Sequence, residues 1–247
     1  MNTINRRTAV MASLLLVDPA LHAAPGATGN ALVEGQQAWQ LDLPGDPKPM
    51  RFWLYLPKGY VESTRRWPLV VFLHGSGERG DELEAVKRHG PPKRVGQGVD
   101  YPFILVSPQL EANARWDPVR LHALRAELQR LLRVDARLIS ATGLSLGGHG
   151  VWDWVAAFPD DLAAIAPVCG YGDPAAVCRA RLVPVRAYHG DADTVVPIER
   201  QQACVDALRA CGGQVEFIIY PGEGHGAWNP AYEDPALVPW LMAQARR

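Results

Sequence analysis

The chain has 247 residues, which is enough for one large α/β domain with a sizeable core. Its formal net charge is −1 and its pI is near 6.7, with the arginines scattered along the chain. This balance argues against a nucleic-acid-binding face and against a polybasic membrane-binding surface.

Residues 1–24 have the pattern of an export signal. Arg6 and Arg7 provide a positive start, residues 9–17 form an apolar run, and Ala23-Ala24 are small residues suited to cleavage. The apolar run is too short for a membrane span, which needs about 20 residues. The paired arginines fit a twin-arginine signal and an ordinary Sec signal equally well. We therefore expect a mature chain from about residue 25, in the periplasm or outside the cell.

Short apolar runs alternate with helix-like segments along the rest of the chain. The first two runs suggest a hairpin at a sheet edge, and the later, continuously apolar runs are typical of buried parallel strands. The predicted strands are 37–43, 50–56, 68–73, 101–106, 137–142, 162–168, 183–188 and 215–220, and the predicted helices are 82–89, 117–133, 148–158, 198–210 and 235–246. This alternation predicts an α/β fold: a mainly parallel, doubly wound sheet flanked by helices, in a single domain over residues 25–247. Active sites of such sheets lie at the carboxyl ends of the strands.

The pentapeptide Gly143-Leu144-Ser145-Leu146-Gly147 lies between a predicted strand and a predicted helix. A strand, a sharp turn and a helix form the setting in which G-x-S-x-G presents a nucleophilic serine. Glycine is expected at 143 and 147 because a side chain there would clash with the neighbouring strand or helix. Ser145 is therefore the predicted nucleophile, and the N–H of Leu146 is a predicted oxyanion donor. The alternative is a glycine-rich turn with an incidental serine.

A serine hydroxyl needs a base within hydrogen-bond reach and an acid that orients the base. His225 lies in the loop after the last predicted strand, and Asp191 and Asp193 lie in the loop after strand 183–188. These loops share the carboxyl edge of the predicted sheet with Ser145. The order serine, acid, histidine along the chain differs from the orders in chymotrypsin and subtilisin.

Five segments carry a family resemblance: HGSGERG (74–80), YPFILVSPQ (101–109), GLSLGGHG (143–150), HGDADTVVP (189–197) and GEGHGAW (222–228). On these segments nearly the whole mature chain resembles the α/β-hydrolase superfamily. The similarity is to its phospholipase/carboxylesterase and dienelactone-hydrolase-like branch, which includes secreted esterases called predicted peptidases.

The resemblance implies an α/β-hydrolase fold and selects Asp193 as the acid, which leaves Asp191 to shape the turn by accepting backbone N–H bonds. It also implies that the N–H of Ser76 is the second oxyanion donor. Dienelactone hydrolases proper carry cysteine at the nucleophile position. Ser145 therefore moves the expected activity toward ester hydrolysis.

Other residues near the predicted site loops have two possible roles. Trp116 and Trp228 are candidates for the wall of a substrate pocket, with ordinary packing as the alternative. His74 is expected to form structural hydrogen bonds. Glu78, Arg79 and Asp81 are expected to brace the loop after strand 68–73 by ion pairs, with contact to the substrate as the alternative. The His, Asp and Glu residues lack zinc-site spacing, so we infer no metal and no cofactor.

Four cysteines lie in the last third of the chain, and none forms a C-x-x-C pair. Cys169 and Cys178 flank a loop that a disulfide could close in an oxidising compartment. Cys204 and Cys211 lie on one predicted helix, about 10.5 Å apart along its axis, which exceeds the roughly 7 Å that a disulfide spans. We therefore expect Cys169–Cys178 to be bonded and the other two cysteines to be reduced.

Together these features predict an exported serine esterase that cleaves a small-molecule carboxylic ester through an acyl-enzyme. A serine peptidase acting on small peptides and a non-catalytic binding protein on a hydrolase scaffold remain as alternatives. No nucleic-acid partner and no membrane span are expected. The acyl and alcohol specificity and the oligomeric state do not follow from the sequence.

Overall fold

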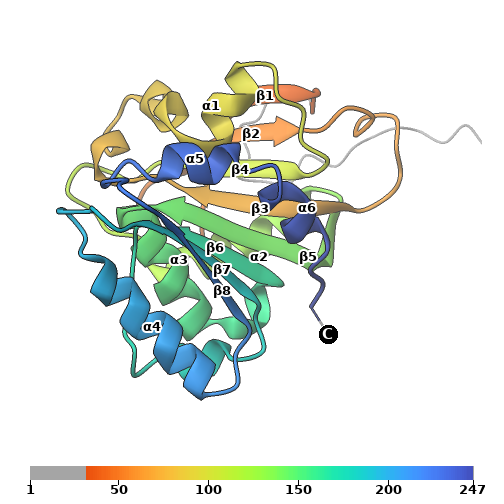
Figure 1. Cartoon of the computed structure of the whole chain (residues 1–247). Helices are drawn as coiled ribbons and strands as arrows, with labels where there is room; N and C mark the ends of the chain where they lie inside the picture. The colour runs from red at the N-terminus through yellow and green to blue at the C-terminus, as the bar shows by residue number, and fades with distance from the viewer. Residues whose placement is uncertain (1–31, 247) are drawn as a thin grey trace, which may run out of the picture.

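The computed structural model describes residues 32–246 (Figure 1). The predicted export signal, residues 1–24, lies outside the described residues. Among the helices of residues 32–246, none combines the length and the apolar character needed to cross a membrane.

An eight-stranded sheet runs through the described part of the chain, with the strand order β1-β2-β4-β3-β5-β6-β7-β8. The strands are β1 (Gly35–Leu41), β2 (Met50–Leu56), β3 (Trp67–Leu73), β4 (Ile104–Pro108), β5 (Val134–Leu144), β6 (Ala164–Val168), β7 (Val185–Gly190) and β8 (Val215–Tyr220). The β1–β2 and β2–β4 pairs are antiparallel, and the other five pairs are parallel. The predicted edge hairpin and the mainly parallel sheet are therefore confirmed.

Helices cover both faces of this sheet. They are α1 (Gly90–Gly96), α2 (Pro118–Leu131), α3 (Leu146–Ala157), α4 (Ile198–Ala210), α5 (Trp228–Glu233) and α6 (Leu237–Met242), with short 3₁₀ helices η1 (Ser76–Glu78), η2 (Leu83–Arg88), η3 (Pro159–Asp161) and η4 (Val177–Ala180). Figure 1 shows α3 and α4 below the sheet, and α1, α5 and α6 above it.

Alternate residues of β3 belong to two hydrophobic cores. Leu69, Val71 and Leu73 pack in the core that includes α2, α3 and α4, whereas Val70 and Phe72 pack in the core that includes α5 and α6. All five side chains are at most 1% exposed. Burial on both faces explains why this strand is continuously apolar, since successive side chains point to opposite sides.

Two short helices were not predicted. α1 begins at Gly90-Pro91-Pro92, a composition that favours a loop, but proline is well suited to the first turn because the N–H it lacks has no partner there. α5 contains Pro230, also in its first turn. The predicted helix 82–89 is instead the 3₁₀ helix η2, and the predicted helix 235–246 ends early, as α6.

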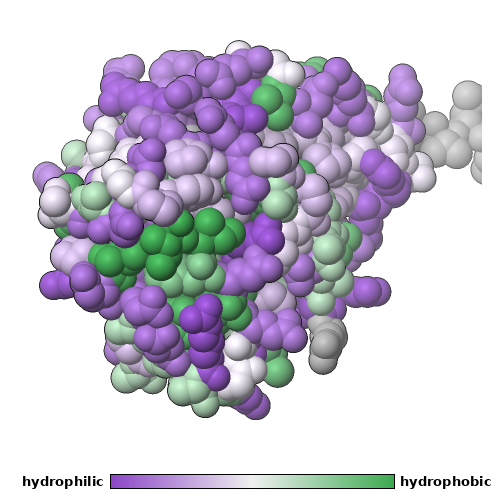
Figure 2. Space-filling model, in the orientation of Figure 1, coloured by the Kyte–Doolittle hydropathy of each residue, from purple (hydrophilic) through white to green (hydrophobic). Residues whose placement is uncertain are grey.

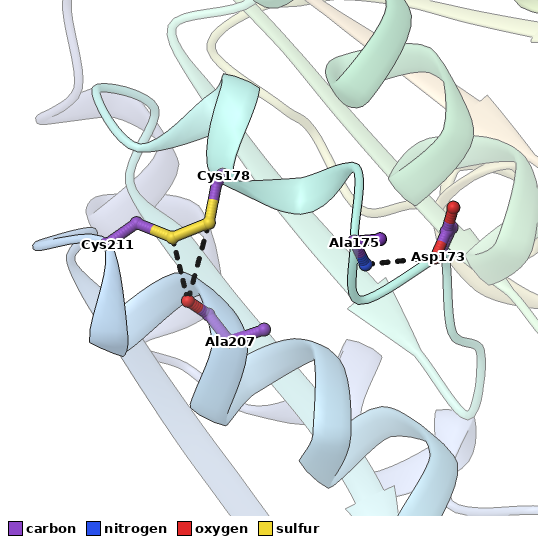
Figure 3. The surroundings of a disulfide bond; sticks show 5 residues. All are labelled: Asp173, Ala175, Cys178, Ala207 and Cys211. Atoms are coloured by element: carbon purple, nitrogen blue, oxygen red, sulfur yellow. Dashed lines mark hydrogen bonds between the residues drawn. A yellow bond between two sulfur atoms is a disulfide. The ribbon is translucent and has the colours of Figure 1, made fainter.

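The disulfide differs from the prediction. Cys178 is bonded to Cys211, with Cα atoms 5.7 Å apart, and the bond joins η4 to the end of α4 (Figure 3). Cys169 and Cys204 are free and buried. The prediction of a Cys169–Cys178 bond was wrong because Cys169 points into the interior at the end of β6, where its thiol lies close to Asp193. The prediction that Cys204 and Cys211 do not pair is confirmed, as is the reduced state of Cys204, but the prediction that Cys211 is reduced was wrong.

Candidate active site

Ser145 lies in the sharp turn between β5 and α3. Its backbone has φ +52° and ψ −116°, a left-handed region that costs a non-glycine residue on the order of 1–3 kcal/mol. The Ser145 N–H donates to the Val168 carbonyl (2.9 Å), and the Ser145 carbonyl accepts from the His149 N–H (3.0 Å). The surrounding strand and helix therefore hold the serine in this strained conformation.

The glycines of the pentapeptide are required by close backbone contacts. A Cβ atom at position 147 would lie 1.9 Å from the Leu73 carbonyl oxygen, and one at position 143 would lie 2.5 Å from the Gly147 carbonyl oxygen. Both distances are far inside van der Waals contact. The predicted need for glycine at Gly143 and Gly147 is confirmed.

The side chains of Ser145, His225 and Asp193 form one hydrogen-bonded row. Ser145 Oγ lies 2.9 Å from His225 Nε2, and His225 Nδ1 lies 2.7 Å from Asp193 Oδ2. When Nδ1 carries the proton that bonds the carboxylate, Nε2 has the lone pair that can accept the serine proton. The structure thus brings together three side chains from the loops after β5, β7 and β8.

The environment of Asp193 favours its carboxylate form. The residue is 7% exposed, and its Oδ1 accepts the N–H groups of Val195 and Val196, both at 2.9 Å. Burial opposes ionisation, but the hydrogen bonds from His225 and from the two N–H groups outweigh it and hold the pKa of Asp193 below its usual value. A charged acid at this position can stabilise an imidazolium.

Asp191 has a different role. Its side chain is exposed, and its Oδ1 accepts the N–H of Gly222 at 2.7 Å. This bond joins the loop after β7 to the loop after β8. The predicted contribution of Asp191 to loop shape is therefore confirmed.

The two predicted oxyanion donors lie beside the nucleophile. Leu146 is the first residue of α3 and Ser76 is the first residue of η1, so neither N–H has an acceptor within its own helix. Both residues line the same cleft as Ser145. Ser76 and Leu146 thus lie at the cleft of the predicted nucleophile, as an oxyanion-binding role requires.

His74 supports the loop that contains Ser76. Its Nε2 accepts the Leu110 N–H (3.0 Å), and its Nδ1 donates to the Gly75 carbonyl (2.6 Å). Burial lowers the pKa of His74 to about 4, so the ring is neutral near neutral pH. The predicted structural role of His74 agrees with these bonds.

Arg79 and Glu78 hold the following part of this loop. Arg79 Nε donates to the Ser76 carbonyl at 3.0 Å. Glu78 is 5% exposed, and one of its carboxylate oxygens lies 3.8 Å from His89 Nε2. These contacts fit the predicted bracing role.

Neither predicted tryptophan is among the described residues that line the cleft. Trp116 is 5% exposed and donates its indole N–H to the His74 carbonyl (3.1 Å), which fits the packing alternative. Trp116 packs against Gly150. A Cβ atom at position 150 would lie 2.6 Å from the Cβ atom of Trp116. Trp228 packs edge-on against the His225 ring, with centroids 5.1 Å apart.

The cleft beside Ser145 has a volume of about 370 Å³. Besides Ser76, Ser145 and Leu146 it is lined by Arg115, His149, Tyr171, Val195, Val196, Pro197 and Arg200. Figure 2 shows an apolar patch on a mostly hydrophilic face, over β8 and beside the start of α4. Ile219 (42% exposed) lies in β8, and Val195 (66% exposed) lies in the loop that leads into α4.

The sequence did not point to the two arginines of the cleft. Arg115 lies in the loop between β4 and α2, and Arg200 lies in the first turn of α4. In the sequence, each of the two arginines lies close to a predicted site loop, and this position could have indicated a role at the site. The indication was weak because other arginines are scattered along the chain.

Cys169, His189 and Asp193 are the group within residues 32–246 whose possible metal-ligand atoms lie close together, all within 4.8 Å. These atoms already have other partners: His189 Nε2 donates to the Val196 carbonyl at 2.8 Å, and Asp193 binds His225. Burial raises the pKa of the Cys169 thiol to about 12, which disfavours the thiolate that a metal requires. The group fits hydrogen bonding around the acid better than metal binding.

Comparisons with known proteins identify the superfamily. The prolyl oligopeptidase family matches residues 173–238, which include Asp193 and His225. The "Putative carboxymethylenebutenolidase" of Yersinia pestis is 32% identical over 110 residues, 40% of each chain. The crystal structure of a thermostable esterase is 30% identical with a TM-score of 0.77, and the match covers 85% of this chain and 63% of that one. The chain belongs to the α/β-hydrolase superfamily.

The feruloyl esterase module from Clostridium thermocellum shares the fold of this α/β-hydrolase. The TM-score is 0.65 at 17% identity, over 88% of this chain and 92% of that one. The predicted α/β-hydrolase fold is therefore confirmed.

The chain spans about 40% of the length of the curated relatives it matches first.

Proposed function

We propose that this α/β-hydrolase cleaves carboxylic esters through an acyl-enzyme formed on Ser145. The observation that carries the proposal is the hydrogen-bonded row from Ser145 through His225 to Asp193 at the carboxyl edge of the sheet. Among the similar proteins are a carboxymethylenebutenolidase-type protein and a thermostable esterase, which supports ester substrates.

Each group of the site has one role in this reaction. His225 Nε2 takes the proton of Ser145 as Oγ attacks the ester carbonyl carbon, and the N–H groups of Leu146 and Ser76 stabilise the oxyanion. The bond to the alcohol oxygen then breaks, and His225 returns the proton to that oxygen while the acyl group stays on Oγ. Water repeats the sequence, releasing the acid and restoring the serine. Asp193 stays ionised and stabilises the imidazolium.

Turnover of p-nitrophenyl acetate and labelling by a fluorophosphonate probe test the proposal. Ser145→Ala should fold normally, lose turnover and lose labelling, because a small half-buried side chain is shortened. Asp193→Asn should lower kcat on the order of 10⁴-fold. Asp191→Asn is the matched control, with a much smaller expected effect, since its carboxylate contacts only a loop N–H. Turnover that survives Ser145→Ala would refute the assignment of the nucleophile.

A serine peptidase is the second candidate function. The prolyl oligopeptidase family matches residues 173–238, and the same three side chains can cleave amides. A panel of small peptides measured beside short acyl esters separates the two candidates. Faster cleavage of the peptides would replace the ester proposal, and absence of Ser145 labelling in folded protein would favour a binding protein.

We also propose that the protein is exported to the periplasm or secreted, on the pattern of residues 1–24 alone. Fractionation of cells that produce the full chain tests this. Full-length protein retained in the cytoplasm would contradict it.

A further inference from the structure

The cleft beside Ser145 carries two positive side chains and, among its described lining residues, no carboxylate. Its polar lining side chains belong to Ser76, Arg115, Ser145, His149, Tyr171 and Arg200. The remaining lining residues, Leu146, Val195, Val196 and Pro197, are apolar. The cleft therefore has a net positive charge next to the nucleophile.

Arg200 is held in place without being neutralised. Its guanidinium donates to the Tyr171 hydroxyl and lies 4.9 Å from the centre of the Tyr171 ring. A tyrosine hydroxyl carries no charge at neutral pH, so the positive charge of Arg200 remains available. Within residues 32–246 no carboxylate forms an ion pair with it, unlike the paired Arg120 and Arg186.

Arg115 forms neither a hydrogen bond nor an ion pair within the described residues, and its side chain is exposed. Its positive charge still affects the pKa values of two neighbouring side chains, His149 and Asp153. Burial is the main cause that lowers the pKa of His149, and Arg115 adds to it. Burial raises the pKa of Asp153, and Arg115 opposes that rise. Asp153 lies on α3 but does not line the cleft, so the positive charge of Arg115 at the cleft has no partner there.

We propose that Arg115 and Arg200 form a subsite for a carboxylate group carried by the ester substrate. The proposal rests on the esterase function proposed above and adds the class of substrate. A planar guanidinium matches a carboxylate in shape and hydrogen bonding, and such charge-assisted bonds are stronger than neutral ones. The apolar side of the cleft, Val195, Val196 and Pro197, then contacts the hydrocarbon that links the carboxylate to the ester.

Two pairs of esters test which part of the substrate carries the carboxylate. 4-Nitrophenyl hydrogen adipate has it on the acyl part, and 4-nitrophenyl methyl adipate is its neutral counterpart. 4-Acetoxybenzoate has it on the alcohol part, and methyl 4-acetoxybenzoate is its neutral counterpart. In one pair, kcat/KM for the charged ester should exceed that for the neutral ester by about tenfold or more, and that pair identifies the side on which the subsite lies.

Three variants attribute this preference to the cleft. Arg115→Gln and Arg200→Gln should each lower the charged-to-neutral ratio of kcat/KM by about tenfold. Arg181→Gln is the control: it removes the same charge from an exposed residue that precedes β7, at the opposite end of that strand from Asp193, and should leave the ratio unchanged. Arg115 forms no hydrogen bond or ion pair within residues 32–246, so its variant tests the proposal even if Arg200→Gln folds poorly.

Ratios near one in both ester pairs, or ratios that neither cleft variant changes, would overturn the carboxylate subsite. Neutral esters would still be turned over in that case, and the esterase function would stand. Absence of turnover with all four esters and with p-nitrophenyl acetate would instead overturn the proposed function.

Discussion

Removing the Cys178–Cys211 disulfide should destabilise the protein by several kcal/mol. The two cysteines are 33 residues apart in sequence. For a loop of that size, the chain-entropy relation gives about 12.5 cal/mol/K of lost unfolded-state entropy, or about 3.7 kcal/mol at 25 °C. In a protein of this size that loss corresponds to a decrease in Tm of roughly 7–15 °C.

The bond also encloses part of the candidate site. The loop that it closes contains β7, Asp193 and all of α4, including Arg200. The disulfide thus restricts the unfolded states of the segment that supplies the acid. Removing the bond should change the free energy of unfolding more than the cleft, because Cys211 follows the last residue of α4 whereas the cleft residue Arg200 lies in the first turn of that helix.

The double variant Cys178→Ala/Cys211→Ala provides the perturbation, and urea unfolding followed by tryptophan fluorescence provides the measurement. Reductant should lower the stability of the wild type to that of the double variant, and should not change the double variant itself. Mapping of peptides without reduction should recover the Cys178–Cys211 pair. A loss of less than about 1 kcal/mol would refute the loop-entropy reasoning, and a mapped bond to Cys169 would refute the pairing.

Ser76→Pro removes the N–H proposed to bind the oxyanion, at a first helical position where proline is tolerated, and should lower kcat on p-nitrophenyl acetate by about 10²–10³-fold. Ser76→Ala keeps that N–H, so an equal loss there would contradict the role of the backbone. Gly147→Ala should abolish soluble folding because its Cβ would lie 1.9 Å from the Leu73 carbonyl oxygen, whereas Gly96→Ala, with nothing within 4 Å, should hardly change the melting curve. Because burial lowers the pKa of His74 to about 4, the unfolded chain takes up a proton near pH 6.5 that the folded chain does not bind until about pH 4. The contribution of His74 to stability should therefore fall by about 3 kcal/mol from pH 6.5 to 4 and level off below that. Urea unfolding across this window should show a smaller decrease in stability for His74→Asn than for the wild type, and equal decreases would refute the prediction.

The three side chains proposed to act in catalysis could be found from the sequence because each lies in a local pattern. G-x-S-x-G marks Ser145, and the loops with His225 and with the pair Asp191 and Asp193 each follow a short apolar run. The family resemblance then selected Asp193 over Asp191. In a parallel sheet the carboxyl ends of neighbouring strands meet at one edge, so the strand pattern alone brings these loops together. The strands 50–56 and 215–220 were predicted with the bounds of β2 and β8 because their apolar runs end at turn-forming residues.

The remaining features depended on contacts between distant segments. A disulfide requires two Cα atoms at the right separation, and that distance between η4 and the end of α4 is set by packing, which left Cys169 inside the protein. Trp116 packs against Gly150, and the cleft is positively charged because Arg115, from the loop before α2, and Arg200, from α4, line the same cleft. The sequence by itself thus determined the three side chains of the hydrogen-bonded row and the mainly parallel character of the sheet, because both follow from local patterns and strand direction. Only the tertiary structure decided which side chains surround that row, because those contacts join residues that no local pattern relates.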